Sequence, residues 1–256
     1  MVQENRVHHG LNWPFDEQGF KKLVSRGKSV TKKPMEDGTL TQQAYLRLRR
    51  DILLGVLPPG SRMRIDALKR QYNIGPTPLR EALSRLLADG FVIAENHRGF
   101  SIPPVTLEDL RDITEQRKLI ECTALRKAIE AADDQYESHL VAAFHRLSRT
   151  DDRLKGRDPA LMEEWEQRHR EFHYVLIEGS RSPWLIRFQS TLYDQADRYR
   201  RLYLAEAFVP DEVREDHLLI KEATLDRDAK SACTLLNTHI ERVYKIASTS
   251  SYFNPT

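Results

Sequence analysis

The chain has 256 residues, of which 40% are hydrophobic and 30% charged, with a formal net charge of +2, a composition typical of a soluble, helix-rich globular protein. No apolar run approaches the roughly 20 residues that span a bilayer, and the polar first residues lack the apolar region of a secretory signal, so a membrane or a secreted protein is not expected. The two cysteines, Cys122 and Cys233, are too few for a disulfide framework, and we expect both to be reduced in a cytosolic protein.

The net charge of +2 is unevenly distributed along the chain. Residues 39–104 carry ten Lys and Arg against five Asp and Glu, which gives +5, and residues 1–38 add +2. Residues 105–256 carry 23 basic and 28 acidic residues, which gives −5. A basic module joined to an acidic one indicates that the basic part faces phosphate groups.

Short helices are predicted from residue 39 onward, after a polar arm of residues 1–38 that we expect to be flexible. The first helix begins near Thr41 and ends before the turn Pro58-Pro59-Gly60, and the second covers Ile65 to Asn73. We take residues 39–104 as one domain.

The third predicted helix runs from Thr77 to Gly90, with Thr77 as its N-cap and Pro78 in its first turn. Its apolar positions follow the i, i+3, i+4, i+7 spacing of an amphipathic helix. Segments 91–94 and 100–102 then form a predicted β-hairpin, and Pro103-Pro104 ends the module. Three helices followed by a two-stranded wing predict a winged helix-turn-helix whose third helix enters the major groove of DNA.

Several polar residues of this module are candidates for DNA contact. Arg80 is the expected base-contacting residue, because a guanidinium binds guanine in bidentate fashion, and Thr77 is placed to hold a phosphate. Alternatively, the arginines are solvated surface residues. The full candidate set is Arg64, Thr77, Arg80, Ser84 and the wing residues His97, Arg98 and Gly99.

These motifs resemble the GntR family of bacterial regulators. Pro59-Gly60, then the run from Thr77 to Leu83 (Thr-Pro-Leu-Arg-Glu-Ala-Leu), Gly90-Phe91-Val92 and Arg98-Gly99-Phe100 follow the order and spacing of that family. Gly75-Pro76 stands where the family usually has Ser-Arg, which removes one arginine commonly used on DNA. The family's usual arginine near Asp66 is also missing, and Arg64, Lys69 and Arg70 are candidates to replace it.

The part after the wing is predicted to be an all-helical domain of residues 105–250, followed by a tail of residues 251–256. Its predicted helices cover residues 106–132, 134–149, 158–179, 182–206, 210–226 and 229–248. Four of the nine histidines lie on or beside the apolar stripes of three of these helices, namely His169, His173, His217 and His239. Imidazoles are good ligands for zinc, nickel, iron or copper, although hydrogen-bonded core histidines are the alternative.

This helical part resembles the ligand-binding domain (FCD type) of the FadR subgroup, whose members often hold a divalent metal with one Asp and three His. The resemblance implies that His173, His217 and His239 are the three histidine ligands, and it places His169 where the subgroup has Asp. A four-histidine set favours zinc or nickel over magnesium. In the alternative arrangement His169 does not bind the metal, and a carboxylate of the effector completes the coordination.

An arginine on the buried stripe of helix 106–132 must be paired. Arg117 has Glu121 one turn later, so the two could form an internal ion pair, or Arg117 could clamp the carboxylate of a ligand. The resemblance to FadR-type domains implies the second role, toward organic acids. Arg198 and Tyr199 are further candidates for contacts with the effector.

Taken together, these features predict a cytoplasmic bacterial regulator, present on the nucleoid when bound to DNA. It would be a homodimeric repressor, as is usual in the family it resembles, that reads a palindromic operator under the control of a small carboxylate bound near a metal. The alternatives are a metal-dependent enzyme and a helical scaffold with a polar core. Against an enzyme, Glu171 is misplaced for the peptidase motif H-E-x-x-H, and no nucleophile with a base is found.

Overall fold

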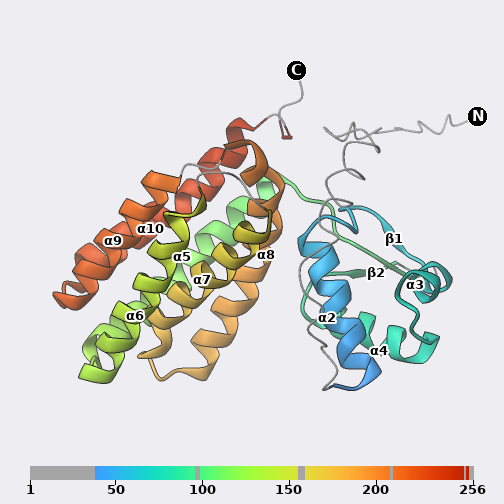
Figure 1. Ribbon diagram of the computed structural model, residues 1–256, viewed down its shortest axis with the longest axis horizontal. Coiled ribbons are helices and arrows are strands. Elements are labelled where there is room, and N and C mark those ends of the chain that lie inside the picture. The colour runs from blue at the N-terminus through green and yellow to red at the C-terminus, as the bar shows by residue number, and fades with distance from the viewer. Residues whose placement is uncertain (1–37, 96–98, 155–158, 208–209, 251, 254–256) are drawn as a thin grey trace, which may run out of the picture. The chain divides into compact units, whose positions relative to one another are not determined.

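The computed structural model describes residues 38–95, 99–154, 159–207, 210–250 and 252–253. The arm of residues 1–37 and the wing residues His97 and Arg98 lie outside the described residues. The predicted fold class is confirmed: short helices with a small antiparallel sheet come first, and long helices follow (Figure 1). Within the described part, no helix is both long enough and apolar enough to cross a membrane.

The predicted DNA-binding module, residues 39–104, is built from three helices and a three-stranded sheet. The helices are α2 (Leu40–Leu53), α3 (Ile65–Tyr72) and α4 (Pro76–Ala88), and the strands are β1 (Arg62–Met63), β2 (Ile93–Glu95) and β3 (Gly99–Ser101). β3 is the central strand and pairs antiparallel with both neighbours. β1 was not predicted, because two residues are too few to show the alternation of a strand.

The start of α4 differs from the prediction. The helix begins at Pro76, its N-cap is Gly75, and Thr77 lies inside the first turn, so the prediction of Thr77 as the N-cap is wrong. The physical reason is that proline suits the first helical position, where its fixed φ is helical and its missing N–H has no partner to lose. The other end agrees with the prediction, since Gly90 follows the helix with a φ of 74°.

Hydrophobic side chains fill the interior of this module. The fully buried leucines of α4 face α2 and the residues that lead into β2. The buried set is Ala44, Leu48, Ile52, Leu53, Met63, Leu68, Tyr72, Ile74, Leu79, Ala82, Leu83, Leu86, Phe91, Val92 and Ile102. This packing leaves the other face of α4 to solvent, as its amphipathic pattern predicts.

The helical domain contains the six helices expected after the wing. They are α5 (Leu107–Glu130), α6 (Asp134–Asp151), α7 (Pro159–Glu178), α8 (Pro183–Ala207), α9 (Pro210–Leu225) and α10 (Ala229–Thr249). Each bound lies within two residues of the predicted one. α5 packs against α7, α8 and α10, and α6 packs against α7 and α9 (Figure 1). This arrangement turns one side of α7, α9 and α10 toward the interior.

Candidate metal and effector site

The four histidines of the prediction meet in the interior of the helical domain. α7 supplies His169 and His173, which lie one turn apart on the stripe that also buries Trp165 and Phe172. α9 supplies His217 and α10 supplies His239. All four residues are buried, with 6% exposure or less.

The imidazole rings are close enough to share one ion. One ring nitrogen from each of the four histidines lies within 4.8 Å of the corresponding nitrogens of the others. The Nε2 atoms of His173 and His239 are 3.2 Å apart. Trp165 stacks on His169 at 4.6 Å between ring centroids, and Phe172 lies edge-on to His217 at 5.0 Å. These aromatic walls limit access of water to the cluster.

Contacts of Nδ1 orient three of the four imidazole rings. In His173 and His239 the Nε2 atoms face each other, so Nδ1 lies on the side away from the cluster centre. The Nδ1 atom of His239 donates to Asp216 at 3.1 Å, and that of His169 lies 2.6 Å from the hydroxyl of Tyr193. The Nδ1 atom of His173 is 3.5 Å from Glu121, an electrostatic contact. A carboxylate partner requires a proton on Nδ1, which leaves the Nε2 lone pair for a metal.

The donor set fits a metal ion. Both ring nitrogens of His217 are buried and have no hydrogen-bond partner among the described residues, which is costly unless another ligand satisfies them. Burial lowers the pKa of His173 to about 4 and lowers the pKa values of His169, His217 and His239 as well. The imidazoles are therefore neutral at pH 7, which is the state that binds metal.

Arg117 and Glu121 of α5 lie beside the histidines. They are 3% and 1% exposed, and Nε of Arg117 donates to Oε1 of Glu121 at 2.7 Å. Burial by itself would raise the pKa of Glu121, but Arg117 and His173 lower it to about 2, so this carboxylate is ionised. The internal ion pair considered from the sequence is therefore present, and its charged groups border the site of the four histidines.

Arg198 and Tyr199 occupy a different place. Arg198 donates to the carbonyl oxygen of Pro103 at 2.9 Å and to Gln195 at 2.9 Å. The hydroxyl of Tyr199 donates to Asp109 and accepts from the backbone N–H of Thr106 at 3.3 Å. Both side chains thus contact the segment between β3 and α5, and the structure does not bring them to the histidines.

The described DNA-contact candidates are all exposed. Thr77, Arg80 and Ser84 share the solvent face of α4, and Arg64 directly precedes α3. Arg80 has no ion pair with any described residue. Gly99 opens β3 with a φ of 91°, a conformation that favours glycine. The face of α4 opposite the apolar core is therefore free to meet a ligand.

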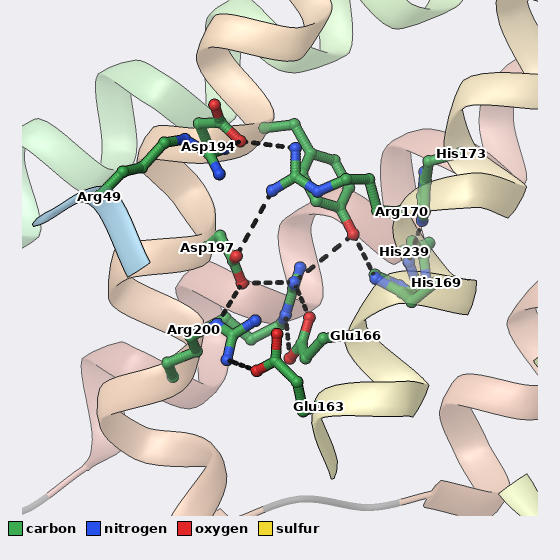
Figure 2. Close-up of polar contacts among 12 residues, drawn as sticks. Arg49, Glu163, Glu166, His169, Arg170, His173, Asp194, Asp197, Arg200 and His239 are labelled. Carbon is green, nitrogen blue, oxygen red and sulfur yellow. Dashed lines mark hydrogen bonds and ion pairs between the residues drawn. The ribbon is translucent and has the colours of Figure 1, made fainter. Parts of the chain in front are cut away.

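Sequence reasoning missed several residues that surround the histidines. Glu166 lies three residues before His169, so helical i, i+3 spacing places it next to the histidine stripe and could have identified it. It forms a buried ion pair with Arg200, which also donates to Asp197 at 2.7 Å (Figure 2). Tyr193 carries no such signal, because its role depends on which helix packs against α7.

Comparisons with known proteins agree with these two parts. Residues 40–102 match the model of the bacterial regulatory proteins of the gntR family, and residues 112–242 match the FCD domain. The uncharacterized HTH-type transcriptional regulator BphR of Paraburkholderia xenovorans LB400 is 41% identical over 79% of this chain and 83% of its own. The HTH-type transcriptional repressor GlaR of Escherichia coli K12 is 32% identical over 77% of this chain and 90% of its own.

A solved structure shares the arrangement. E. coli McbR/YncC superimposes with a TM-score of 0.67 at 25% identity, covering 82% of this chain and 98% of that one. These relatives are transcriptional regulators and not enzymes, which agrees with the expectation from the sequence. The resemblance inferred from the Thr77–Leu83 motif is confirmed as well: the chain belongs to the GntR family of bacterial transcriptional regulators and carries a C-terminal FCD domain of the kind found in the FadR subgroup.

Proposed function

We propose that this regulator is a repressor whose DNA binding is controlled by a small organic acid. We further propose that it binds a divalent metal through His169, His173, His217 and His239. The observation that carries the proposal is the convergence of four buried, neutral imidazoles, one of which has no other partner for its ring nitrogens. Four nitrogen donors favour zinc or nickel over magnesium, which prefers oxygen.

The acid would bind beside Arg117. When bound, the metal would supply a positive charge and a vacant or exchangeable coordination position for a carboxylate. The guanidinium of Arg117 matches a carboxylate in geometry, and Glu121 holds this group in place at 2.7 Å. If the carboxylate takes a coordination position, His169 is the histidine it replaces, because this residue is oriented by the neutral hydroxyl of Tyr193.

At the other end of the chain, Arg80 would contact a base in the major groove and Thr77 and Ser84 would contact phosphates. Arg64 would add a phosphate contact from the start of α3, and His97, Arg98 and Gly99 of the wing would reach the backbone or the minor groove. A homodimer would place two α4 helices on a palindrome in the bacterial cytoplasm, where the operator lies. Repression is the direction of regulation of the relative GlaR, a transcriptional repressor.

The DNA-binding part of the proposal is tested with duplexes selected from a random pool by the wild-type protein. Arg80→Ala should weaken binding about 10- to 100-fold, the effect of one lost bidentate base contact of about 1–3 kcal/mol. Arg111→Ala is the matched control, since this arginine is exposed on α5 of the helical domain. Unchanged binding by Arg80→Ala would remove Arg80 from this role.

The effector part is tested by a thermal-shift screen of short organic acids on metal-free and zinc-loaded protein. A true effector should stabilise the loaded protein more than the metal-free one, and should change the affinity for the selected duplex about 5- to 150-fold. If no acid stabilises either form, the carboxylate site at Arg117 is wrong. A purified protein that neither contains nor takes up a metal would contradict the metal site.

A further inference from the structure

One carboxylate, that of Asp194 on α8, joins the helical domain to the DNA-binding module. Its Oδ1 atom lies 2.6 Å from Nη2 of Arg49 on α2 and 2.5 Å from Nη1 of Arg170 on α7. Figure 2 shows the two arginines approaching this carboxylate from opposite sides. The Asp194 side chain is only 15% exposed, so both ion pairs are sheltered from the screening that weakens surface pairs.

The Arg170 end of this contact is continuous with the histidine cluster. His169 and Arg170 are consecutive on α7, and Tyr193 and Asp194 are consecutive on α8. The Tyr193 hydroxyl lies 2.6 Å from Nδ1 of His169, and the Arg170 guanidinium lies over the Tyr193 ring at 4.5 Å. Two successive residues of α7 therefore hold two successive residues of α8, which gives a continuous path of contacts from His169 to Asp194.

The Arg49 end leads to the helix that carries the predicted base contact. α2 is bonded to α4 at two places: the hydroxyl of Thr41 donates to Glu81 at 2.6 Å, and Arg85 donates to Gln42 at 2.7 Å. The two helices also pack through their buried residues. Arg49 therefore lies on a helix that is both hydrogen-bonded to α4 and packed against it.

The Asp194–Arg49 contact is the only ion pair between α8 and residues 38–102 in the part of the chain that the structure describes. A hydrogen bond from Gln195 to the backbone carbonyl of Asp89 at 3.0 Å also joins α8 to this range, and Arg198 donates to the carbonyl of Pro103, just beyond it, at 2.9 Å. A groove of about 550 Å³ opens beside Asp194, lined by Tyr45 of α2, Asp89 at the end of α4 and residues of α8. It provides space in which the pair can separate.

Asp194 is also part of a network in which charges balance. Among the described residues the network contains four guanidinium groups and four carboxylates: Arg49, Arg170, Arg200 and Arg201 with Glu163, Glu166, Asp194 and Asp197. Without Asp194, Arg170 keeps Asp197 at 3.5 Å, whereas Arg49 loses its acidic partner. Loss of this one carboxylate therefore disconnects α2 and leaves the rest of the network paired.

We propose that Asp194 is a positioning residue that couples occupancy of the histidine site to the DNA-binding module. The inference rests on the proposed function, because it requires that metal at the histidines changes the affinity for DNA. In the coupled protein, the metal fixes His169, the His169–Arg170 and Tyr193–Asp194 pairs fix Asp194, and Asp194 fixes Arg49 and α2. Uncoupling should leave metal binding and DNA binding intact as separate events.

The test is Asp194→Asn in the full chain, with Zn²⁺ as the probe of the site and the selected duplex as the DNA. Fluorescence anisotropy gives the Kd for DNA of the chelator-treated and zinc-loaded proteins. The ratio of the two values should be at least about fivefold for the wild type, the lower end of typical allosteric coupling. For Asp194→Asn it should fall to less than about twofold, with unchanged zinc stoichiometry.

The matched control is Glu163→Gln, which removes a carboxylate from the same network at Arg201, away from α2, and should keep the wild-type ratio. Asp194→Glu retains the charge and should recover part of the ratio. Arg49→Gln breaks the same contact from its more exposed partner and should reproduce the loss, which keeps the test available if Asp194→Asn does not fold.

The outcomes separate the two proposals. If neither zinc nor any acid changes the Kd of the wild-type protein for DNA, the proposed regulatory function is wrong. A wild type that responds, together with Asp194→Asn or Arg49→Gln variants that respond equally, overturns only the role of Asp194. An equal loss in Glu163→Gln also overturns it, because the total charge of the network rather than this contact would then carry the coupling.

Discussion

Residues 40–102 bury leucines and other apolar side chains around α4, and Ser101 is the only polar residue buried among the described ones there. Residues 107–250 bury apolar side chains too, but they also bury Arg117, Glu121 and Arg200 with less than 6% exposure, together with the four histidines. Buried charge is expensive and often stabilises less than an apolar core would. The difference indicates that the first region is built to hold one shape, whereas the second keeps groups whose value is in binding.

The largest difference between the two regions is expected at the buried pair Arg117–Glu121. Arg117→Met alone should destabilise the helical domain by about 3–5 kcal/mol, because it leaves an unpaired buried carboxylate. Arg117→Met with Glu121→Leu should recover most of that loss, since an apolar pair of similar volume is often neutral or stabilising. Urea unfolding followed by circular dichroism measures both.

The control is the pair Arg111–Glu115, which has the same spacing on the same helix but is 68% and 58% exposed. Arg111→Met should cost no more than about 0.5 kcal/mol. If the Arg117 and Arg111 variants cost the same, the interior of the helical domain is more hydrated than the structure indicates.

A metal bound at the histidine cluster should stabilise the helical domain. Adding zinc to metal-free protein at about 100 times its Kd should stabilise the helical domain by about 2.7 kcal/mol, by mass action on the folded state. His217→Ala should abolish this gain because it removes one of the four converging rings. His139→Ala, an exposed histidine on α6, is the control, and calorimetric melting measures each protein with and without zinc.

One result with His217→Ala would contradict the proposed metal site at the four histidines. A His217→Ala protein that is stabilised by zinc as much as the wild type would show that the metal binds elsewhere, for example at the surface. Stabilisation of the His139→Ala protein should be unchanged.

The two regions also differ in how much of them could be predicted. The helices and the histidine stripe could be read from the sequence, because helical periodicity places i and i+4 on one face and four inward histidines leave few alternatives. Tyr193, Asp216 and Asp194 could not, because their roles depend on which helix faces which, and periodicity within one helix does not contain that information. The same holds for Arg198. Its burial could be predicted from the sequence, but its contact with the carbonyl oxygen of Pro103 could not.

The smallest expected effects are those of removing a helix N-cap, and they should lower the free energy of unfolding equally in both regions. Thr39 caps α2 by accepting from Gln42 N–H at 3.2 Å, and Thr106 caps α5 by accepting from Asp109 N–H at 3.1 Å. Thr→Ala at either position should cost about 1 kcal/mol, the usual value of such a cap, and Thr→Ser should restore most of it. Since a cap acts on its own helix backbone, its contribution should not depend on whether the core beneath is apolar or charged. Urea unfolding of the four variants tests this: a Thr106→Ala cost several times that of Thr39→Ala would mean that the start of α5, which also holds Tyr199, is coupled to the polar interior.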